Sequence, residues 1–304
     1  MRVVSLLPSA TELLCQIGGS DLLVGRSHEC DWPARVRELP SLTAQRTPTH
    51  AESSQLIDSF VRTSRATGES LYTVDGDLLR SLEPDLIVTQ DLCEVCSIDL
   101  ASVREIASRM KVPPRIVSLN PRSWWDVLDD CLRLGDAIGR PRAAEEAMVA
   151  LRERWWTAVD FVNPYSGGEE VLFLEWMDPP FVGGHWTPQL ISTAGGRHSL
   201  NEAGNASRVV KPEEILEAAP TRVVVAPCGY SISETRRLLD EVTRQSWWPL
   251  LPAVVEGPGR VALVDGSHMF NRPGPRLVDA LEWLVGWLND RPQLIPEGFP
   301  VEYL

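Results

Sequence analysis

The middle of the chain is the part that most limits the fold. From about 122 to 159, apolar residues recur at helical spacing. Gly139-Arg140-Pro141 either kinks this stretch or splits it into two helices. On both sides, short apolar runs alternate with helices, which is typical of mainly parallel sheets covered by helices. The sequence therefore predicts an α/β fold with two Rossmann-like lobes joined by a long backbone helix, with boundaries at 1–120, 121–162 and 163–304.

The alternation can be assigned to individual segments. Near the start, Pro8-Ser9 follows an apolar run, and Ser9 with Glu12 has the spacing of a helix cap and capping box. Gly18-Gly19 ends that helix. Strands are predicted at 2–7, 85–89, 115–119, 170–174, 222–226 and 261–264, and the other helices at 77–82, 102–110, 188–194, 212–218, 231–243 and 275–288.

One segment has a counterpart in the other half of the chain. Residues 77–84 read as a short helix that ends in Pro84 and leads into Leu86-Ile87-Val88. Residues 213–220 end in Pro220 and lead into Val223-Val224-Val225. The echo predicts that the two lobes are built alike.

Charge and hydropathy exclude several classes. The net charge of −13 and a pI near 4.9 disfavour nucleic acid and anionic lipid, which are themselves negatively charged. No apolar run reaches the length that spans a membrane, so membrane insertion is not expected. No secretory signal is visible, so the chain as given is expected to be cytoplasmic, or periplasmic if a leader was removed.

Polar and aromatic loops follow the predicted strands. In parallel sheets, ligands collect where strands end and helices begin. The aromatic residues suit a flat ligand, the His residues a metal centre, and the arginines carboxylates or phosphate. The candidate ligand-binding residues are Pro8, Ser9, Arg26, His28, Glu29, Trp32, Gln90, Trp176, Phe181, His185, Trp186, Phe270, Asn271 and Arg272.

Four residues have the chemistry of a metal site. Cys93 and Cys96 form a Cys-x-x-Cys pair, which alone is half a zinc site, a redox pair or two incidental thiols. With His28 and Cys30 they would complete a four-ligand site for zinc or iron, if the fold brings them together. No catalytic motif for nucleophilic, phosphoryl or hydride transfer is present, so the chain is not expected to be an enzyme.

Across most of its length the sequence resembles the periplasmic cobalamin-binding proteins of ABC import systems, which belong to the class of helical-backbone metal-chelate receptors. Singly the matching pieces are weak, but together and in this order they are specific. They are 5–12, 30–33, 82–88, 179–196 and 270–276.

The resemblance implies a class III substrate-binding fold whose ligand is a corrinoid or related metal chelate held between two lobes. It implies that Glu29, Gln90, Phe181 and the Phe270 loop line the cleft. It also implies that Asp77 and Glu213 dock a transporter permease, although acidic residues at helix N-termini also complement the helix dipole.

The residues leave two alternative functions open. One is a metal-dependent enzyme or redox protein that uses His28, Cys30, Cys93 and Cys96. The other is a haem or iron-siderophore receptor on the same scaffold.

Overall fold

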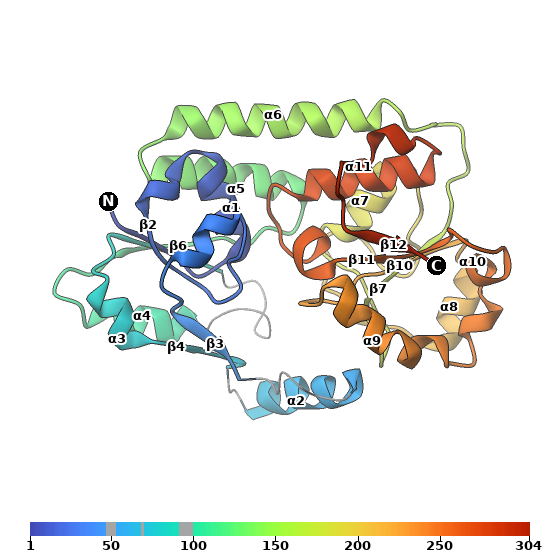
Figure 1. The fold of residues 1–304 in the computed structure, drawn as a ribbon, viewed down its shortest axis with the longest axis horizontal. Helices are drawn as coiled ribbons and strands as arrows, with labels where there is room; N and C mark the ends of the chain where they lie inside the picture. Colours follow the sequence, from blue (N-terminus) through green and yellow to red (C-terminus); the bar gives the residue numbers. More distant parts are fainter. Residues whose placement is uncertain (47–52, 68–69, 91–99) are drawn as a thin grey trace. The chain divides into compact units, whose positions relative to one another are not determined.

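A computed structural model of the chain describes residues 1–46, 53–67, 70–90 and 100–304 (Figure 1). The described residues form two compact units. Unit 1 holds 1–46, 59–67, 70–90, 100–121 and 125–150, and unit 2 holds 53–58, 122–124 and 151–304.

Unit 1 is built on a parallel sheet of four strands in the order β2-β1-β5-β6. Residue Val4 of β1 pairs with Gly25 of β2 and with Ile87 of β5. The strands are β1 (Val3–Ser5), β2 (Leu23–Arg26), β5 (Leu86–Thr89) and β6 (Arg115–Ser118).

Helices cover both faces of this sheet, because successive side chains of a strand point to opposite faces. Val3 and Val88 pack with α1 (Pro8–Gln16) and α5 (Trp124–Ala137) on one face. Val4 and Ile87 pack with α3 (Gly76–Ser81) and α4 (Leu100–Ser108) on the other. Apolar runs without polar alternation are what such a doubly covered strand requires.

Smaller elements complete this part of the chain. An antiparallel pair joins β3 (Thr43–Gln45) to β4 (Tyr72–Val74), with Thr43 opposite Val74. The amphipathic helix α2 (Ser54–Thr67) lies between them in the sequence. Short 3-10 helices span Gly19–Leu22 and Ala34–Glu38.

Unit 2 has a mixed sheet of six strands in the order β12-β11-β10-β7-β8-β9. The three central strands, β11, β10 and β7, are parallel, and β12, β8 and β9 join antiparallel. The strands are β7 (Val171–Trp176), β8 (Phe181–Val182), β9 (Arg208–Val209), β10 (Arg222–Val225), β11 (Val261–Val264) and β12 (Val301–Tyr303).

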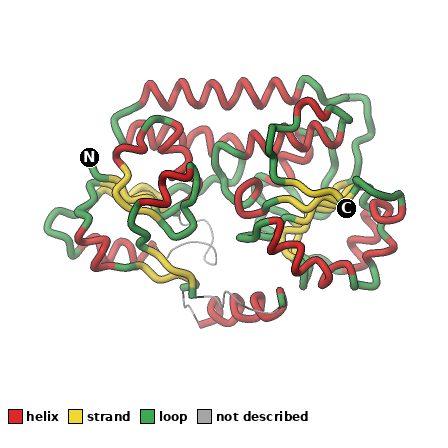
Figure 2. Tube along the Cα trace, in the orientation of Figure 1, coloured by secondary structure: helices red, strands yellow, loops and turns green. Residues whose placement is uncertain are grey.

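The two faces of this sheet carry different cores. One packs Leu172 and Val223 against residues of α8 (Pro212–Ala218), α9 (Ile232–Thr243) and α10 (Pro252–Val255). On the other, Phe173 contacts Phe270, which in turn contacts Trp283. Figure 2 shows the helices around the strands of each unit, including α7 (Thr187–Thr193) and α11 (Leu277–Leu288).

The central helical stretch is two helices. α5 ends at Ala137 and α6 (Pro141–Val159) begins four residues later. Gly139 between them has a φ of 71°, a left-handed conformation that glycine adopts without cost. The break therefore falls where the sequence allows it, and the expected boundaries at 121–162 stay a prediction.

The predicted helix cap at Ser9 is wrong. α1 begins at Pro8, and its N-cap is Leu7, which makes no side-chain cap bond. Proline is favoured at the first helical position because its φ is preset and it lacks the N–H that would go unpaired. Ser9 is consequently a buried residue inside the first turn.

The echo between the two halves is present in the backbone. α3 and α8 are each followed by a residue with positive φ and then a proline: Glu83 at 41° and Ala219 at 48°. The strand after each proline then lies parallel to the first strand of its unit, β5 on β1 and β10 on β7.

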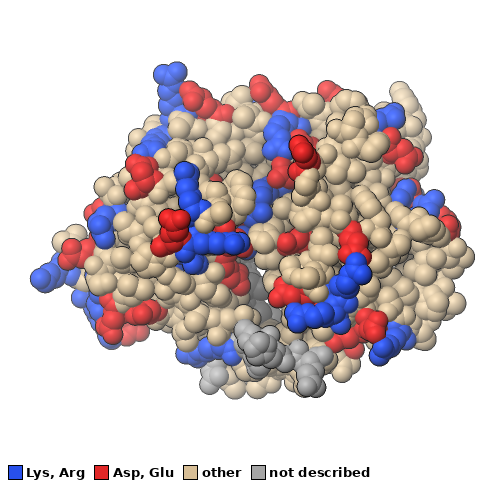
Figure 3. All heavy atoms as spheres, viewed as in Figure 1, with Lys and Arg blue, Asp and Glu red and all other residues tan. Residues whose placement is uncertain are grey.

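The distribution of charged side chains and the hydropathy of the helices can be compared with the expectations from the sequence. Acidic and basic side chains are interspersed on the face that Figure 3 shows. Within the described parts of the chain, no helix combines the length and the apolar character needed to cross a membrane.

The left-handed residue Ala219 gives a stability prediction. We expect Ala219→Gly to raise the free energy of unfolding by about 0.5–1 kcal/mol, because relief of left-handed strain outweighs the extra freedom of the unfolded chain. Ala218→Gly, one residue earlier and still in α8, should lower it by about 0.5–1 kcal/mol. Urea unfolding measures both, and a loss of stability in Ala219→Gly would contradict the strain argument.

Candidate functional site

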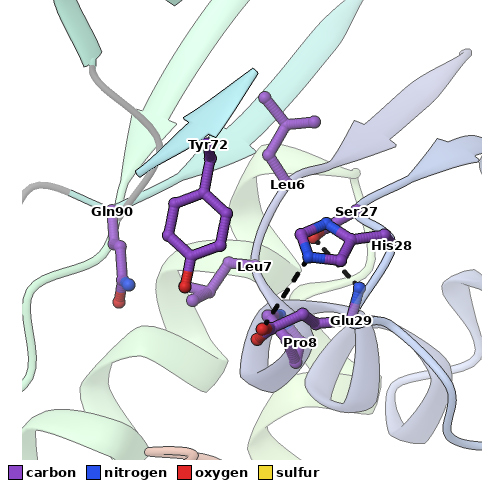
Figure 4. Close-up of a pocket in the computed structure, with 8 residues that line it drawn as sticks. All are labelled: Leu6, Leu7, Pro8, Ser27, His28, Glu29, Tyr72 and Gln90. Carbon is purple, nitrogen blue, oxygen red and sulfur yellow. Dashed lines mark hydrogen bonds and ion pairs between the residues drawn. The ribbon is translucent and has the colours of Figure 1, made fainter. Parts of the chain in front are cut away.

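A pocket of about 270 Å³, counting the space at its mouth, lies in unit 1 where the strands of the parallel sheet end. Figure 4 shows His28, Tyr72 and Gln90 around one space, with Glu29 beside His28. The rings of His28 and Tyr72 are tilted, with centroids 5.6 Å apart. The lining residues are Leu6, Leu7, Pro8, Ser27, His28, Glu29, Tyr72 and Gln90.

The sheet brings these residues together. Pairing of β1 with its neighbours continues past the strand ends: the Leu6 N–H donates to the Val88 carbonyl, and the Ser27 N–H donates to the Ser5 carbonyl. Parallel strands end at the same edge, so the segments after β1, β2 and β5 meet there. β4 adds Tyr72 through its pairing with β3.

Hydrogen bonds to Thr43 fix the orientation of His28. The Thr43 hydroxyl donates to Ser27 Oγ at 3.1 Å and accepts the backbone N–H of His28 at 2.9 Å. Nδ1 of His28 lies 2.6 Å from the same hydroxyl. Because the hydroxyl hydrogen is already given to Ser27, Nδ1 carries the proton and Nε2 holds a lone pair.

Nε2 of His28 is buried and makes no hydrogen bond. Oε1 of Glu29, at 3.9 Å, is beyond hydrogen-bond distance. A histidine held through Nδ1 with a free Nε2 lone pair is the usual arrangement of a metal-ligating imidazole. The same lone pair can also accept a hydrogen bond from a ligand.

Burial lowers the pKa of His28 from its ordinary value. The Glu29 carboxylate acts to raise this pKa, and the Arg26 guanidinium adds to its lowering. His28 is therefore uncharged at neutral pH.

The other predicted ligand-binding residues of unit 1 do not line this pocket. Arg26 donates to the carbonyls of Ser27, His28 and Arg37, which fixes the loop. Ser9 is buried in α1, and Trp32 is 43% exposed.

The four-ligand metal site is not assembled by the described residues. Cys30 is fully buried, and its sulfur accepts the Thr11 hydroxyl at 3.0 Å. Cys93 and Cys96 lie outside the described residues. Among those that are described, no group of three or more His, Cys, Asp and Glu residues is arranged to hold a metal ion.

In unit 2, two aromatic residues that were predicted to bind ligand, Trp186 and Phe270, are core residues. Trp186 is buried and donates from Nε1 to the Phe270 carbonyl at 2.6 Å. Phe270 is 1% exposed and lies against Phe173 and Trp283. Their contacts anchor the loop after β11.

The other candidates of unit 2 lie around the carboxyl ends of its strands. Trp176 contacts the ring of Tyr230 at 5.6 Å, and its buried Nε1 makes no hydrogen bond. Asn271 donates to the carbonyls of Ala226 and Gly266. Arg272 is buried and donates to Ser267 Oγ, and Phe181 is partly buried in β8.

His185 has a φ of 52° and a buried Nδ1 without a hydrogen bond. Burial lowers its pKa, and the charge of Arg122 lowers it further. The ligand-binding roles of His185 and the other unit 2 candidates stay predictions.

Sequence reasoning predicted Pro8, His28, Glu29 and Gln90 as ligand-binding residues; all four line the pocket, and their contact with a ligand stays a prediction. It missed Tyr72, because strand–helix alternation does not reveal the β3–β4 pair. Tyr72 is one of only four tyrosines in the chain, which is the signal that was available.

Comparison with known proteins gives the class. No protein-family model matches the chain. It is 22% identical over 292 residues to the vitamin B12-binding protein of Vibrio cholerae serotype O1, a match that covers 95% of this chain and 89% of the relative.

Solved structures of periplasmic binding proteins are similar to the chain in fold. A periplasmic heme binding protein from Pseudomonas aeruginosa superposes with a TM-score of 0.73 at 20% identity, over 95% of this chain and 92% of the other. The periplasmic vitamin B12 binding protein of Vibrio cholerae gives 0.67 at 18% identity, over 96% and 98%.

The chain has the α/β fold of the class III periplasmic substrate-binding proteins, as the sequence predicted. The resemblance to that family is confirmed along the full length. The relatives named above are binding proteins, which agrees with the expectation that the chain is not an enzyme.

The first prediction concerns the role of the Thr43 hydroxyl in orienting His28. Thr43→Val should lower the free energy of unfolding by about 1–3 kcal/mol, because it leaves buried partners unsatisfied. It should also release the Nδ1–H tautomer of His28, which ¹⁵N NMR of the ring detects. Thr43→Ser keeps the hydroxyl and serves as the control. Equal effects of the two variants would contradict the assigned role.

A second prediction concerns pH. The pKa of His28 should lie below its ordinary value of about 6.5. The stability that His28 contributes is then complete above that value and is lost as pH falls through the folded-state pKa. In Glu29→Gln the pKa should fall further, because the attracting carboxylate is gone. NMR titration measures this, with His28→Asn to assign the signal, and an unchanged or raised pKa in Glu29→Gln would refute it.

Proposed function

We propose that this protein binds cobalamin or a related corrinoid, and that the pocket of His28, Glu29, Tyr72 and Gln90 contacts the ligand. The observation that carries the proposal is this pocket, which combines a phenol ring, an amide and an imidazole with an apolar floor. The full-length similarity to a vitamin B12-binding protein supports it.

The size of the pocket limits how much of a ligand it can hold. The 270 Å³ of the pocket includes open solvent at its mouth, so its enclosed space is far smaller than a site that surrounds a whole ligand. A corrinoid is larger than a drug-sized molecule, so the pocket would receive one edge or one side arm of it. In unit 2, we propose Trp176, Phe181 and His185 as ligand-binding residues.

A second candidate ligand is haem. Haem iron takes histidine or tyrosine as an axial ligand. His28 holds its Nε2 lone pair in a pocket that Tyr72 also lines, and this favours a chelate with an open axial position. The similarity in fold to a periplasmic heme binding protein is compatible with it.

We also propose that the chain serves an ABC-type importer and that Asp77 and Glu213 contact its permease. The two residues occupy equivalent places in the first turns of α3 and α8. The side chain of Asp77 is 94% exposed, and Glu213 is exposed as well. Exposed carboxylates suit basic partners, because complementary charges steer and orient the encounter of two proteins.

Titration of the purified protein with dicyanocobinamide, cyanocobalamin and haem, followed by visible spectra, tests the ligand. We expect a corrinoid to bind at micromolar concentration or tighter. Tyr72→Ala should weaken binding by roughly tenfold or more, because it removes a large apolar contact. Tyr165→Ala, a change at a side chain that is 95% exposed, is the control and should bind as the parent does.

The same titration separates the two ligands. Haem binding with a spectrum that changes in His28→Ala or Tyr72→Phe would favour the second candidate. If no corrinoid and no haem binds, the proposal fails.

A further inference from the structure

One nitrogen of the His28 imidazole lacks a hydrogen-bond partner within the described part of the chain. Nδ1 lies 2.6 Å from the Thr43 hydroxyl, whose own hydrogen goes to Ser27 Oγ at 3.1 Å. Nδ1 therefore carries the proton, and Nε2 holds a lone pair. Among the described residues, none donates a hydrogen bond to that lone pair, although the nitrogen is buried. The pocket thus contains an acceptor that a ligand can satisfy.

The surroundings of His28 also keep solvent away from this acceptor. The ring of Tyr72 lies near the imidazole, with the two centroids 5.6 Å apart (Figure 4). Leu6, Leu7 and Pro8 add apolar surface to the same pocket. A buried acceptor that neither protein nor solvent satisfies is destabilising. A ligand that brings a donor removes part of this penalty on binding, whereas a ligand that brings only acceptors does not.

Protonation of Nε2 does not remove the lone pair near neutral pH. The Glu29 carboxylate, with Oε1 3.9 Å from Nε2, favours the charged imidazole, and the Arg26 guanidinium opposes it. Burial has the largest effect and lowers the pKa of His28 below its ordinary value. The 3.9 Å separation is too long for a hydrogen bond. Nε2 therefore meets an incoming ligand as a neutral acceptor.

We propose that Nε2 of His28 accepts a hydrogen bond from an N–H group of the ligand, and that this bond makes the pocket select a chelate with primary amide side arms. The inference rests on the proposed function, because it concerns the same pocket. It goes further, since it gives His28 the role of an acceptor and names the ligand chemistry that this acceptor requires.

The physical basis is the difference between side arms that donate and side arms that only accept. A primary amide has two N–H donors, whereas an ester and an ionised carboxylate have none. An ester or carboxylate oxygen would place its lone pairs against the lone pair of Nε2. A site built to hydrogen-bond one ligand rejects an analogue that leaves its own polar group unpaired. The ester is the informative comparison, because it is uncharged like the amide.

The experiment compares two corrinoids that share the ring, the cobalt and both cyanide ligands. Dicyanocobinamide carries amide side arms, and the heptamethyl ester of dicyanocobyrinic acid carries methyl esters in their place. Dissociation constants are measured by calorimetry at pH 7.5 with the same cosolvent for both ligands. Visible spectra of the complexes are recorded as well. A hydrogen bond to a side arm leaves both cyanides on the cobalt, whereas ligation of the cobalt by Nε2 would displace one and change the spectrum.

Two substitutions separate the Nε2 acceptor from the rest of the imidazole. His28→Asn places an amide where Nδ1 was, so it can still donate to Thr43 but presents nothing at the position of Nε2. We expect it to weaken cobinamide binding about three- to tenfold, as for one net hydrogen bond, and to change ester binding less than about twofold.

His28→Gln is the matched variant. Its amide reaches the position of Nε2, where it can accept from an amide arm or donate to an ester. Cobinamide binding should therefore stay within about twofold of the parent's, and ester binding should become tighter.

NMR of the parent protein supplies a test that needs no folded variant beyond the one that assigns the signal. With ¹⁵N-labelled histidine, dicyanocobinamide should shift the Nε2 signal of His28 in the direction of an accepted hydrogen bond while Nδ1 stays protonated. The ester should leave the Nε2 signal nearly unchanged. Equal shifts with the two ligands would contradict the proposal.

The outcomes distinguish this inference from the proposed function. If corrinoids bind but His28→Asn weakens both ligands equally, or weakens neither, the role of Nε2 is refuted and corrinoid binding stands. Displacement of cyanide on binding makes His28 a metal ligand and refutes it too. If haem binds in place of a corrinoid, this inference fails while binding of a metal chelate stands. If no chelate binds, both proposals fall. Circular dichroism verifies that each variant is folded.

Discussion

The parallel pairing of β1 with β2 and β5 is the constraint on which the site depends. The ladder extends past the strands through the Leu6–Val88 and Ser27–Ser5 backbone bonds, so three loops leave the sheet at one edge. A shift of one residue in this register would turn every side chain to the opposite face. The pocket is therefore a consequence of the sheet, and its side chains can vary without any change in the backbone that positions them.

Polar residues behind the pocket, Thr43 and Arg26, orient the side chains that line it. Thr43 lies on β3, outside the parallel sheet, and its one hydroxyl bonds to Ser27 and twice to His28. These bonds decide which imidazole nitrogen faces the pocket. Arg26 donates from its two terminal nitrogens to loop carbonyls and so holds the loop in which His28 lies. Buried polar groups must find partners, so the supporting layer constrains the lining as strongly as packing does.

Sequence patterns predicted strands where β1, β5, β6, β7, β10 and β11 lie, because apolar runs, glycines and prolines act locally. They did not predict the short outer strands β8, β9 and β12 of the unit 2 sheet. They placed the cap of α1 at Ser9, since a capping box resembles a proline start and only the backbone separates the two. They missed Tyr72, which reaches the pocket through the long-range β3–β4 pair. They gave Trp186 and Phe270 as candidate ligand-binding residues; the side chains of both are buried, which a loop-like sequence does not reveal, and the ligand-binding role stays a prediction.

Backbone similarity alone does not select a ligand in this class. A heme binding protein and a vitamin B12 binding protein superpose on the chain almost equally well, with TM-scores of 0.73 and 0.67. The two ligands are both flat metal chelates, and they differ at the periphery, where one carries carboxylates and the other amides. Discrimination must then come from side chains that meet the periphery, and charge is the property that separates those groups most sharply.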